Sequence, residues 1–264
     1  MKPYLASLPR HAHTSHRGGS LLAPENTLAA FRQAVERWDT DVLELDVRPT
    51  RDGAVVVFHD ETLERTTNGT GPVCEHSLAQ LQALDAGHHL AGWRGRGAVV
   101  PTLQEVLEAF PGKHVNIELK EGADAFLEAF AVVVEGAGAV DRVCVGHVDE
   151  ERAHALRARL PECATFFPQD PLLRFFSATR ADGEPLPDEP WDVLSLPLEY
   201  LGLRVVDARL VEAAHRAGKA VHVWTVDDPG DMHALWDLGV DSILTDRPDV
   251  LRAVMQARGY PRGA

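Results

Sequence analysis

The sequence predicts a (β/α)8 barrel, also called a TIM barrel, with a loop excursion after its second strand. Short β-rich runs alternate with Ala-, Leu- and Arg-rich helical runs, which is the pattern of a parallel sheet covered by helices. The chain has 264 residues, which suits the roughly 250 residues that eight such units occupy. A doubly wound open sheet is the alternative, but no GxGxxG fingerprint follows the first predicted strand.

Eight segments are predicted to be the barrel strands, because most are short runs rich in β-branched and other apolar residues and the first, HAHTSH, leads to a predicted helix. The segment at 163–168 is the weakest of them. In chain order they are HAHTSH (11–16), VLELDV (42–47), HVNIELK (114–120), RVCVGHV (142–148), CATFFP (163–168), DVLSLP (192–197), AVHVWTV (220–226) and DSILTD (241–246).

Helices are predicted after six of these strands, from the amphipathic runs that follow them. The first has Asn26 or Thr27 as its N-cap, and the last has Pro248 in its first turn, where proline is favoured. The predicted helices lie near residues 26–38, 123–137, 149–160, 207–217, 229–238 and 248–258.

The stretch at 51–104 interrupts this alternation. It begins with the hairpin-like RDGAVVVFHD and continues with Gly- and His-rich loop sequence such as DAGHHLAGWRGRG. We therefore expect a single domain over residues 1–264, in which residues 61–104 form an extended loop between the second strand and its helix.

Composition excludes several classes of partner. The formal net charge is -14, which argues against nucleic-acid binding and against docking on anionic lipid. The three cysteines have no CxxC spacing, so we expect a reducing, cytoplasmic location rather than disulfides or a zinc site. No apolar run approaches the ~20 residues of a membrane span and no signal-peptide core is visible, so stable membrane association is not expected.

The segment VLELDV places two carboxylates side by side on an otherwise apolar strand. Glu44 and Asp46 are two residues apart on one strand and therefore share a face. Alone, this pattern is typical of an edge strand with a solvated side. As the second strand of a barrel, however, both faces are enclosed, and its C-terminal end lies at the mouth where barrel enzymes build their sites. Two carboxylates there need cations, either basic side chains or a metal.

Other chemically active residues stand at the ends of the predicted strands. Glu118 adds a third carboxylate, and an oxygen-rich set of this kind favours Mg²⁺ or Ca²⁺ over zinc. Arg17 and Lys120 provide the cations of an anion site, for which phosphate is the natural ligand.

Two histidines complete the predicted site. His16 ends the first strand and His59 ends the hairpin-like segment, and an imidazole pair can supply one general acid and one general base near neutral pH. Together, these residues predict metal-assisted cleavage of a phosphodiester.

The segments that carry these residues resemble the glycerophosphodiester phosphodiesterase family, in order and over nearly the whole chain. They are HRGGSLLAPENTLAAF (16–31), DVLELDVRPTRDGAVVVFHDETLERTTNGTGPV (41–73), NIELK (116–120), VHVWTVDD (221–228) and GVDSILTDRPDVL (239–251). The resemblance implies a TIM barrel that hydrolyses glycerophosphodiesters to glycerol 3-phosphate and an alcohol.

The resemblance also implies a role for each site residue. The implied metal ligands are Glu44, Asp46 and Glu118, the implied catalytic residues are His16 and His59, the implied phosphate-binding residues are Arg17 and Lys120, and the implied aromatic pocket wall is Trp224.

Several alternatives remain open at this stage. Arg17 could pair with Glu44, and Lys120 could neutralise Glu118, as ordinary salt bridges. A lysophospholipase D or a sphingomyelinase-D-like enzyme would use the same barrel, and the pairs Phe166–Phe167 and Phe175–Phe176 are candidates for the exposed apolar patch that such an enzyme needs. The excursion looks short for a cap over the substrate, and the sequence leaves the alcohol, the metal and the oligomeric state undetermined.

Overall fold

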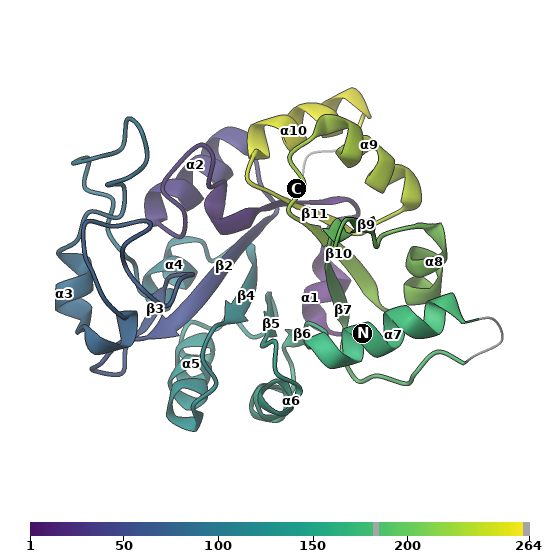
Figure 1. Cartoon of the computed structure of the whole chain (residues 1–264), viewed down its shortest axis with the longest axis horizontal. Coiled ribbons are helices and arrows are strands. Elements are labelled where there is room, and N and C mark those ends of the chain that lie inside the picture. Colours follow the sequence, from purple (N-terminus) through teal and green to yellow (C-terminus); the bar gives the residue numbers. More distant parts are fainter. Residues whose placement is uncertain (182–184, 261–264) are drawn as a thin grey trace.

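The computed structural model describes residues 1–181 and 185–260. Eight parallel strands are hydrogen-bonded in the order β6-β5-β4-β2-β1-β11-β10-β7, and a single parallel bridge between Phe166 and Val193 joins the two ends of this order. The result is a nearly closed barrel surrounded by helices (Figure 1), as the sequence predicts. The strands are β1 (Ala12–Ser15), β2 (Val42–Pro49), β4 (His114–Leu119), β5 (Val143–Gly146), β6 (Ala164–Thr165), β7 (Val193–Pro197), β10 (Ala220–Trp224) and β11 (Ser242–Thr245).

The six predicted helices are confirmed within two residues at each end. Thr27 is the N-cap of the first, because its side chain accepts a hydrogen bond from the backbone N–H of Ala30. The confirmed helices are α2 (Leu28–Trp38), α5 (Asp124–Gly136), α6 (Glu150–Arg159), α8 (Ala208–Arg216), α9 (Pro229–Leu238) and α10 (Pro248–Ala257). No helix in the described part of the chain is long and apolar enough to cross a membrane.

Outside the excursion, two helices and one hairpin were not predicted from the sequence. The helix α7 (Gln169–Arg180) follows β6, and a small antiparallel hairpin of β8 (Glu199–Tyr200) and β9 (Leu203–Arg204) follows β7. The third is the N-terminal α1 (Pro3–Ser7), which places the fully buried Tyr4 against side chains of the barrel interior. The Tyr4 hydroxyl donates to Asn116 Oδ1 at 2.6 Å.

The strand β2 shows how the barrel separates two environments. Leu43, Leu45 and Val47 are fully buried in the cluster that β2 forms with α2, α4 (Leu103–Ala109) and α5. The alternate residues Glu44 and Asp46 consequently face the barrel interior.

The excursion forms a small packed unit beside β2. It contains β3 (Val55–Val57), which is antiparallel to β2, the short helix η2 (Val73–Glu75) and α3 (Leu78–Gln82). Figure 1 shows it on the opposite side of the barrel from α7. Its own apolar cluster contains Val56, Phe58, Leu63, Val73, Leu81, Ala86, Ala98 and Val100.

Candidate active site

A cavity of about 460 Å³ opens at the C-terminal ends of the strands. All eight side chains that the sequence predicts for the site line it, although they come from segments more than 200 residues apart. Its charged wall consists of His16, Arg17, Glu44, Asp46, His59, Glu118 and Lys120. Its apolar wall consists of Phe166, Phe167, Leu172, Leu173, Phe176, Leu196, Pro197, Tyr200, Val205 and Trp224.

The acids of the charged wall are placed by two neighbouring strands. Asp46 of β2 is paired in register with Glu118 of β4, so their side chains stand next to each other on the inner face. Glu44 lies one step deeper on β2. Glu44 and Asp46 are buried, whereas the side chain of Glu118 is 35% exposed.

Asp46 is held by two cations and one side-chain amide. Lys120 Nζ lies 3.0 Å from Oδ1, Arg17 Nε lies 3.3 Å from Oδ2, and Asn26 Nδ2 donates to Oδ2 at 3.0 Å. Burial acts to raise the pKa of Asp46, but Lys120 and Arg17 outweigh it, so the pKa is below its ordinary value. Asp46 is therefore a charged carboxylate at neutral pH.

Glu44 has the opposite character. Burial, together with the negative charge of Asp46, raises the pKa of Glu44 to about 7, against the opposing charges of His16 and Arg17. Its nearest donor is the backbone N–H of Arg17, at 3.0 Å from Oε2. The alternative in which Arg17 forms a salt bridge with Glu44 is therefore not seen, because the contact is made by the Arg17 backbone, while its guanidinium pairs with Glu25 at 3.1 Å and with Asp46.

The carboxylates do not form a ready-made metal cluster. Among the described residues, no group of three His, Cys, Asp or Glu side chains is arranged to hold an ion, and Lys120 Nζ is also 2.9 Å from Glu118 Oε2. The alternative in which Lys120 neutralises Glu118 as a salt bridge is therefore what the structure shows.

The donor chemistry nevertheless fits a hard divalent cation. The three carboxylates of this wall offer only oxygen ligands, the kind that Mg²⁺ and Ca²⁺ prefer. Within the described residues, the buried Asn26 Oδ1 finds no hydrogen-bond partner, although its Nδ2 binds Asp46. The raised pKa of Glu44 likewise marks a carboxylate whose charge is incompletely compensated.

His16 stands in the short helix η1 (His16–Gly18) between two acids. Its Nδ1 is 2.7 Å from Asp246 Oδ1, and its Nε2 is 3.8 Å from Glu44 Oε2. Burial opposes the charged imidazolium, but Glu44 and Asp246 outweigh burial and raise the pKa of His16. Asp246 was not among the predicted site residues, because a carboxylate just before a predicted helix is explained locally by that helix start.

His59 is held in a similar way by its neighbour in sequence. Its Nδ1 lies 2.6 Å from Asp60 Oδ1. An acceptor at Nδ1 favours the tautomer that leaves the lone pair on Nε2. The charged wall therefore contains two imidazoles, each oriented by a carboxylate.

The turn after β1 requires its two glycines. Gly18 and Gly19 have φ values of +85° and +91°, and a Cβ at Gly18 would come within 2.7 Å of Ala30 Cβ. At Gly19 a Cβ would meet Pro248 Cγ at 2.7 Å. The close packing of this turn against α2 and α10 fixes His16 and Arg17 at the mouth.

The apolar wall corrects one expectation from the sequence. Phe175 is fully buried and Phe167 is 6% exposed, so these pairs do not form an exposed patch. The exposed apolar side chains of the cavity lining are instead Val148, Leu173, Tyr200 and Trp224, and the β8–β9 hairpin adds Leu201 and Leu203, which are 86% and 71% exposed. Trp224, at the end of β10, lies where the sequence places it, at the cavity surface.

Comparison with known proteins identifies a family. Residues 16–250 match the model of the "Glycerophosphoryl diester phosphodiesterase family". A glycerophosphodiester phosphodiesterase from Caldanaerobacter subterraneus subsp. tengcongensis is 33% identical, covering 93% of this chain and 98% of that protein. The crystal structure of a glycerophosphodiester phosphodiesterase from Agrobacterium tumefaciens superposes with a TM-score of 0.74 at 32% identity, covering 92% of this chain and 99% of that one. A human protein named lysophospholipase D GDPD1 is 25% identical, covering 91% of this chain and 84% of that protein.

Proposed function

The chain belongs to the glycerophosphoryl diester phosphodiesterase family and is an enzyme that cleaves glycerophosphodiesters; we propose that it releases glycerol 3-phosphate by using one divalent cation and a pair of histidines. One observation carries this proposal. Two carboxylate-held imidazoles, His16 and His59, lie on the same wall as three acids and two cations. Such a wall can hold a phosphate and can both remove and supply a proton.

The three acids Glu44, Asp46 and Glu118 are the proposed ligands of the cation, Mg²⁺ or Ca²⁺. When bound, the ion withdraws negative charge from the phosphate oxygens. Arg17 and Lys120 bind the same phosphate through charge-assisted hydrogen bonds, the former as a fork of donors and the latter as a point charge.

We propose that the reaction has two steps. One histidine accepts the proton of the glycerol 2-hydroxyl, and the 2-oxygen attacks phosphorus while the bond to the leaving alcohol breaks. The second histidine donates its proton to that alcohol, which leaves a cyclic glycerol phosphate. Water then gives a proton to the second histidine and opens the ring, and the first histidine returns its proton to the 2-oxygen. Direct attack by water on the diester is the simpler alternative.

The test of this function uses a substrate panel with glycerophosphocholine and its 2-deoxy analogue. We expect glycerophosphocholine to yield glycerol 3-phosphate, with loss of activity in chelator and recovery on addition of Mg²⁺ or Ca²⁺. Full activity in chelator would exclude a requirement for a divalent cation. An undiminished rate with the 2-deoxy analogue would exclude the cyclic intermediate and favour direct attack by water.

The apolar wall favours a second candidate substrate class, lysophospholipids. A cavity wall with four aromatic rings besides Trp224 is larger than a choline or glycerol group requires, and the hairpin carries exposed Leu201 and Leu203 beside it. An acyl chain bound there would bury apolar surface that is otherwise in contact with water. A comparison of kcat/KM for glycerophosphocholine and lysophosphatidylcholine separates the two candidates. A sphingomyelinase-D-like activity would appear in the same assay with sphingomyelin.

We also propose that the enzyme works in a reducing, cytoplasmic compartment. Cys144 and Cys163 are buried thiols without a disulfide in the described part of the chain, and this supports the expectation from cysteine spacing. Localisation of a tagged full-length chain by cell fractionation tests it.

A further inference from the structure

Arg65, in the excursion, connects two acids that border the charged wall. Its Nη1 and Nη2 donate to Glu25 Oε2 and Oε1 at 2.7 and 2.8 Å. Its Nε and Nη2 donate to Asp60 Oδ2 and Oδ1 at 2.5 and 2.9 Å. The guanidinium therefore forms two forked ion pairs at once, a geometry that a lysine ammonium cannot reproduce.

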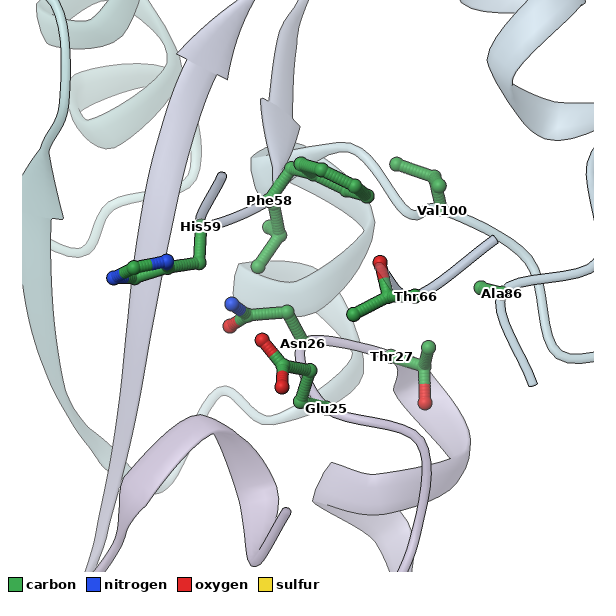
Figure 2. A pocket seen from close by; sticks show the side chains of 9 residues that line it. Glu25, Asn26, Thr27, Phe58, His59, Thr66, Ala86 and Val100 are labelled. Carbon is green, nitrogen blue, oxygen red and sulfur yellow. The ribbon is translucent and has the colours of Figure 1, made fainter. Parts of the chain in front are cut away.

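Each of these acids in turn holds a residue of the charged wall. Asp60 binds His59 Nδ1 at 2.6 Å, and Glu25 binds Arg17 Nη1 at 3.1 Å. A continuous chain of charged contacts thus runs from His59 through Asp60, Arg65 and Glu25 to Arg17. Figure 2 shows its surroundings, with Glu25 and His59 bordering one small pocket and Thr66, which follows Arg65 in sequence, across from them.

The two acids depend on Arg65 to different degrees. The Glu25 side chain is 13% exposed and keeps one cation, Arg17, if Arg65 is removed. Asp60 is 25% exposed and keeps only the His59 contact among its ion pairs with the described residues. Without Arg65, Asp60 is free to rotate towards water, and Arg17 becomes the only cation paired with Glu25 among the described residues.

From this geometry we propose that Arg65 is a positioning residue, which sets the orientation of His59 and of Arg17 at the same time. The inference rests on the proposed roles of these two residues, one in proton transfer and one in phosphate binding. It gives the excursion a function that its sequence does not suggest, because Arg65 is itself 48% exposed and does not line the cavity.

His16 provides an internal contrast. Its partner Asp246 lies between β11 and α10 and is fixed by the barrel, because its backbone N–H donates to Asp227 Oδ1 at 2.9 Å. His16 is therefore expected to keep its orientation when Arg65 is replaced. Replacing Arg65 should therefore change activity by altering the orientation of His59 and Arg17.

The first experiment measures kcat and KM for Arg65→Ala, Arg65→Lys and the control Arg94→Ala with glycerophosphocholine. Arg94 lies in the same excursion, is exposed and donates to the carbonyl of His88. We expect Arg65→Ala to lower kcat/KM by about 10- to 100-fold, in the range of lost supporting contacts. Arg65→Lys should recover only part of this loss, and Arg94→Ala should stay within about twofold of the wild type.

The second experiment is a pair of double-mutant cycles. If Arg65 acts through His59 and Arg17, Arg65→Ala should lower kcat much less in a His59→Ala background, and should raise KM much less in an Arg17→Ala background. Full additivity in both cycles would overturn the proposal, as would an activity loss that only follows a fall in the urea midpoint. Near-normal activity of His59→Ala alone would instead refute the proposed role of His59, so the two failures are distinguishable.

Discussion

The two walls of the cavity are built on different kinds of support. The charged wall stands mainly on β2 and β4, which pair over six residues from Val42 to Val47. The apolar wall takes Leu196, Pro197 and Trp224 from β7 and β10, and its other side chains come from the segment after the two-residue β6, from α7, from the β8–β9 hairpin and from Val205. The seam of the barrel, a single bridge between Phe166 and Val193, also lies on the apolar side.

This difference suggests a division of labour. Catalytic groups must be held within a fraction of an ångström, and the charged wall has the regular strands and the hydrogen-bond chains for that. Substrate selection tolerates larger shifts in side-chain position, and the apolar wall, with its exposed rings and its hairpin, permits such shifts. Mutations in the charged wall should therefore change the rate with every substrate, whereas mutations in the apolar wall should change the choice of substrate.

The largest effect is expected at His59. His59→Ala should lower kcat by about 10²- to 10⁴-fold, as expected for loss of a general acid or base, with all substrates alike. Steady-state kinetics with glycerophosphocholine and glycerophosphoglycerol measures it. His76→Ala, a histidine of the excursion whose Nδ1 contacts the carbonyl of Pro72, is the control. A loss confined to one substrate would contradict the division between the walls.

Glu44 should show activity and stability moving in opposite directions. Its pKa is raised to about 7, so at pH 8 the folded state holds a carboxylate that it stabilises less than water does. Glu44→Gln should therefore raise the free energy of unfolding at pH 8 by about 1–3 kcal/mol in chelator, while activity with Mg²⁺ falls by about 10²-fold or more.

Asp46→Asn is the matched variant on the same strand face. Because the pKa of Asp46 is lowered by Lys120 and Arg17 against the effect of burial, its charge contributes stability, and the substitution should lower the free energy of unfolding. Urea denaturation and initial rates measure both variants. Equal destabilisation by both substitutions would contradict the assignment.

His222, a fully buried side chain of β10, should set an acid limit on stability. Its Nδ1 is 3.4 Å from Asn116 Nδ2, its ring lies edge-on to Phe166, and burial lowers its pKa to about 4. The unfolded chain, with an ordinary histidine pKa near ~6.5, binds this proton more readily than the folded chain. The contribution of neutral His222 to the free energy of unfolding is therefore complete above pH 6.5. It falls by about 3 kcal/mol as the pH falls towards 4.

Urea midpoints from pH 8 to pH 4 test this expectation. His222→Gln should flatten the dependence in that window, whereas His154→Gln, an exposed histidine on α6, should not. An unchanged slope in His222→Gln would assign the acid sensitivity to other groups.

The smallest effect is expected on the apolar wall. Tyr200 lines the cavity and is 53% exposed, so its replacement should not disturb the core. Tyr200→Ser should lower kcat/KM for lysophosphatidylcholine by about 5- to 10-fold, which corresponds to about 1 kcal/mol of lost apolar contact. The value of kcat/KM for glycerophosphoglycerol should not change. Leu201→Ser, in the same hairpin but outside the cavity lining, is the control. Equal losses in both variants would show that the hairpin contacts a lipid surface rather than a bound chain.

The same contrast explains what the sequence could predict. The charged wall was predicted in full, because its residues end regular strands whose alternation is visible in segments such as VLELDV. The eight strands and six of the helices follow from the same periodicity. The strand β6 was a weak prediction since only Ala164 and Thr165 are paired as a strand.

The elements that were missed depend on tertiary contacts. In α7, Pro168 and Pro171 read as helix breakers, yet Pro171 lies in the first turn where proline is tolerated. The helix α1 has five residues and is held mainly through Tyr4. Asp246 was missed because a helix start is a sufficient local explanation for an acid, whereas its contact with His16 spans 230 positions in sequence.

The contact between Tyr4 and Asn116 has a consequence for the solvent inside the barrel. The helix α1 packs Tyr4 against Cys144, Ala164 and Val193 and so covers the end of the barrel opposite the mouth. If Tyr4 were replaced by a small residue, Asn116 would lose its donor and water could enter from below, two residues from Glu118 and beside His222. The N-terminal end of the barrel is thus covered by α1, a segment that belongs to none of the barrel strands.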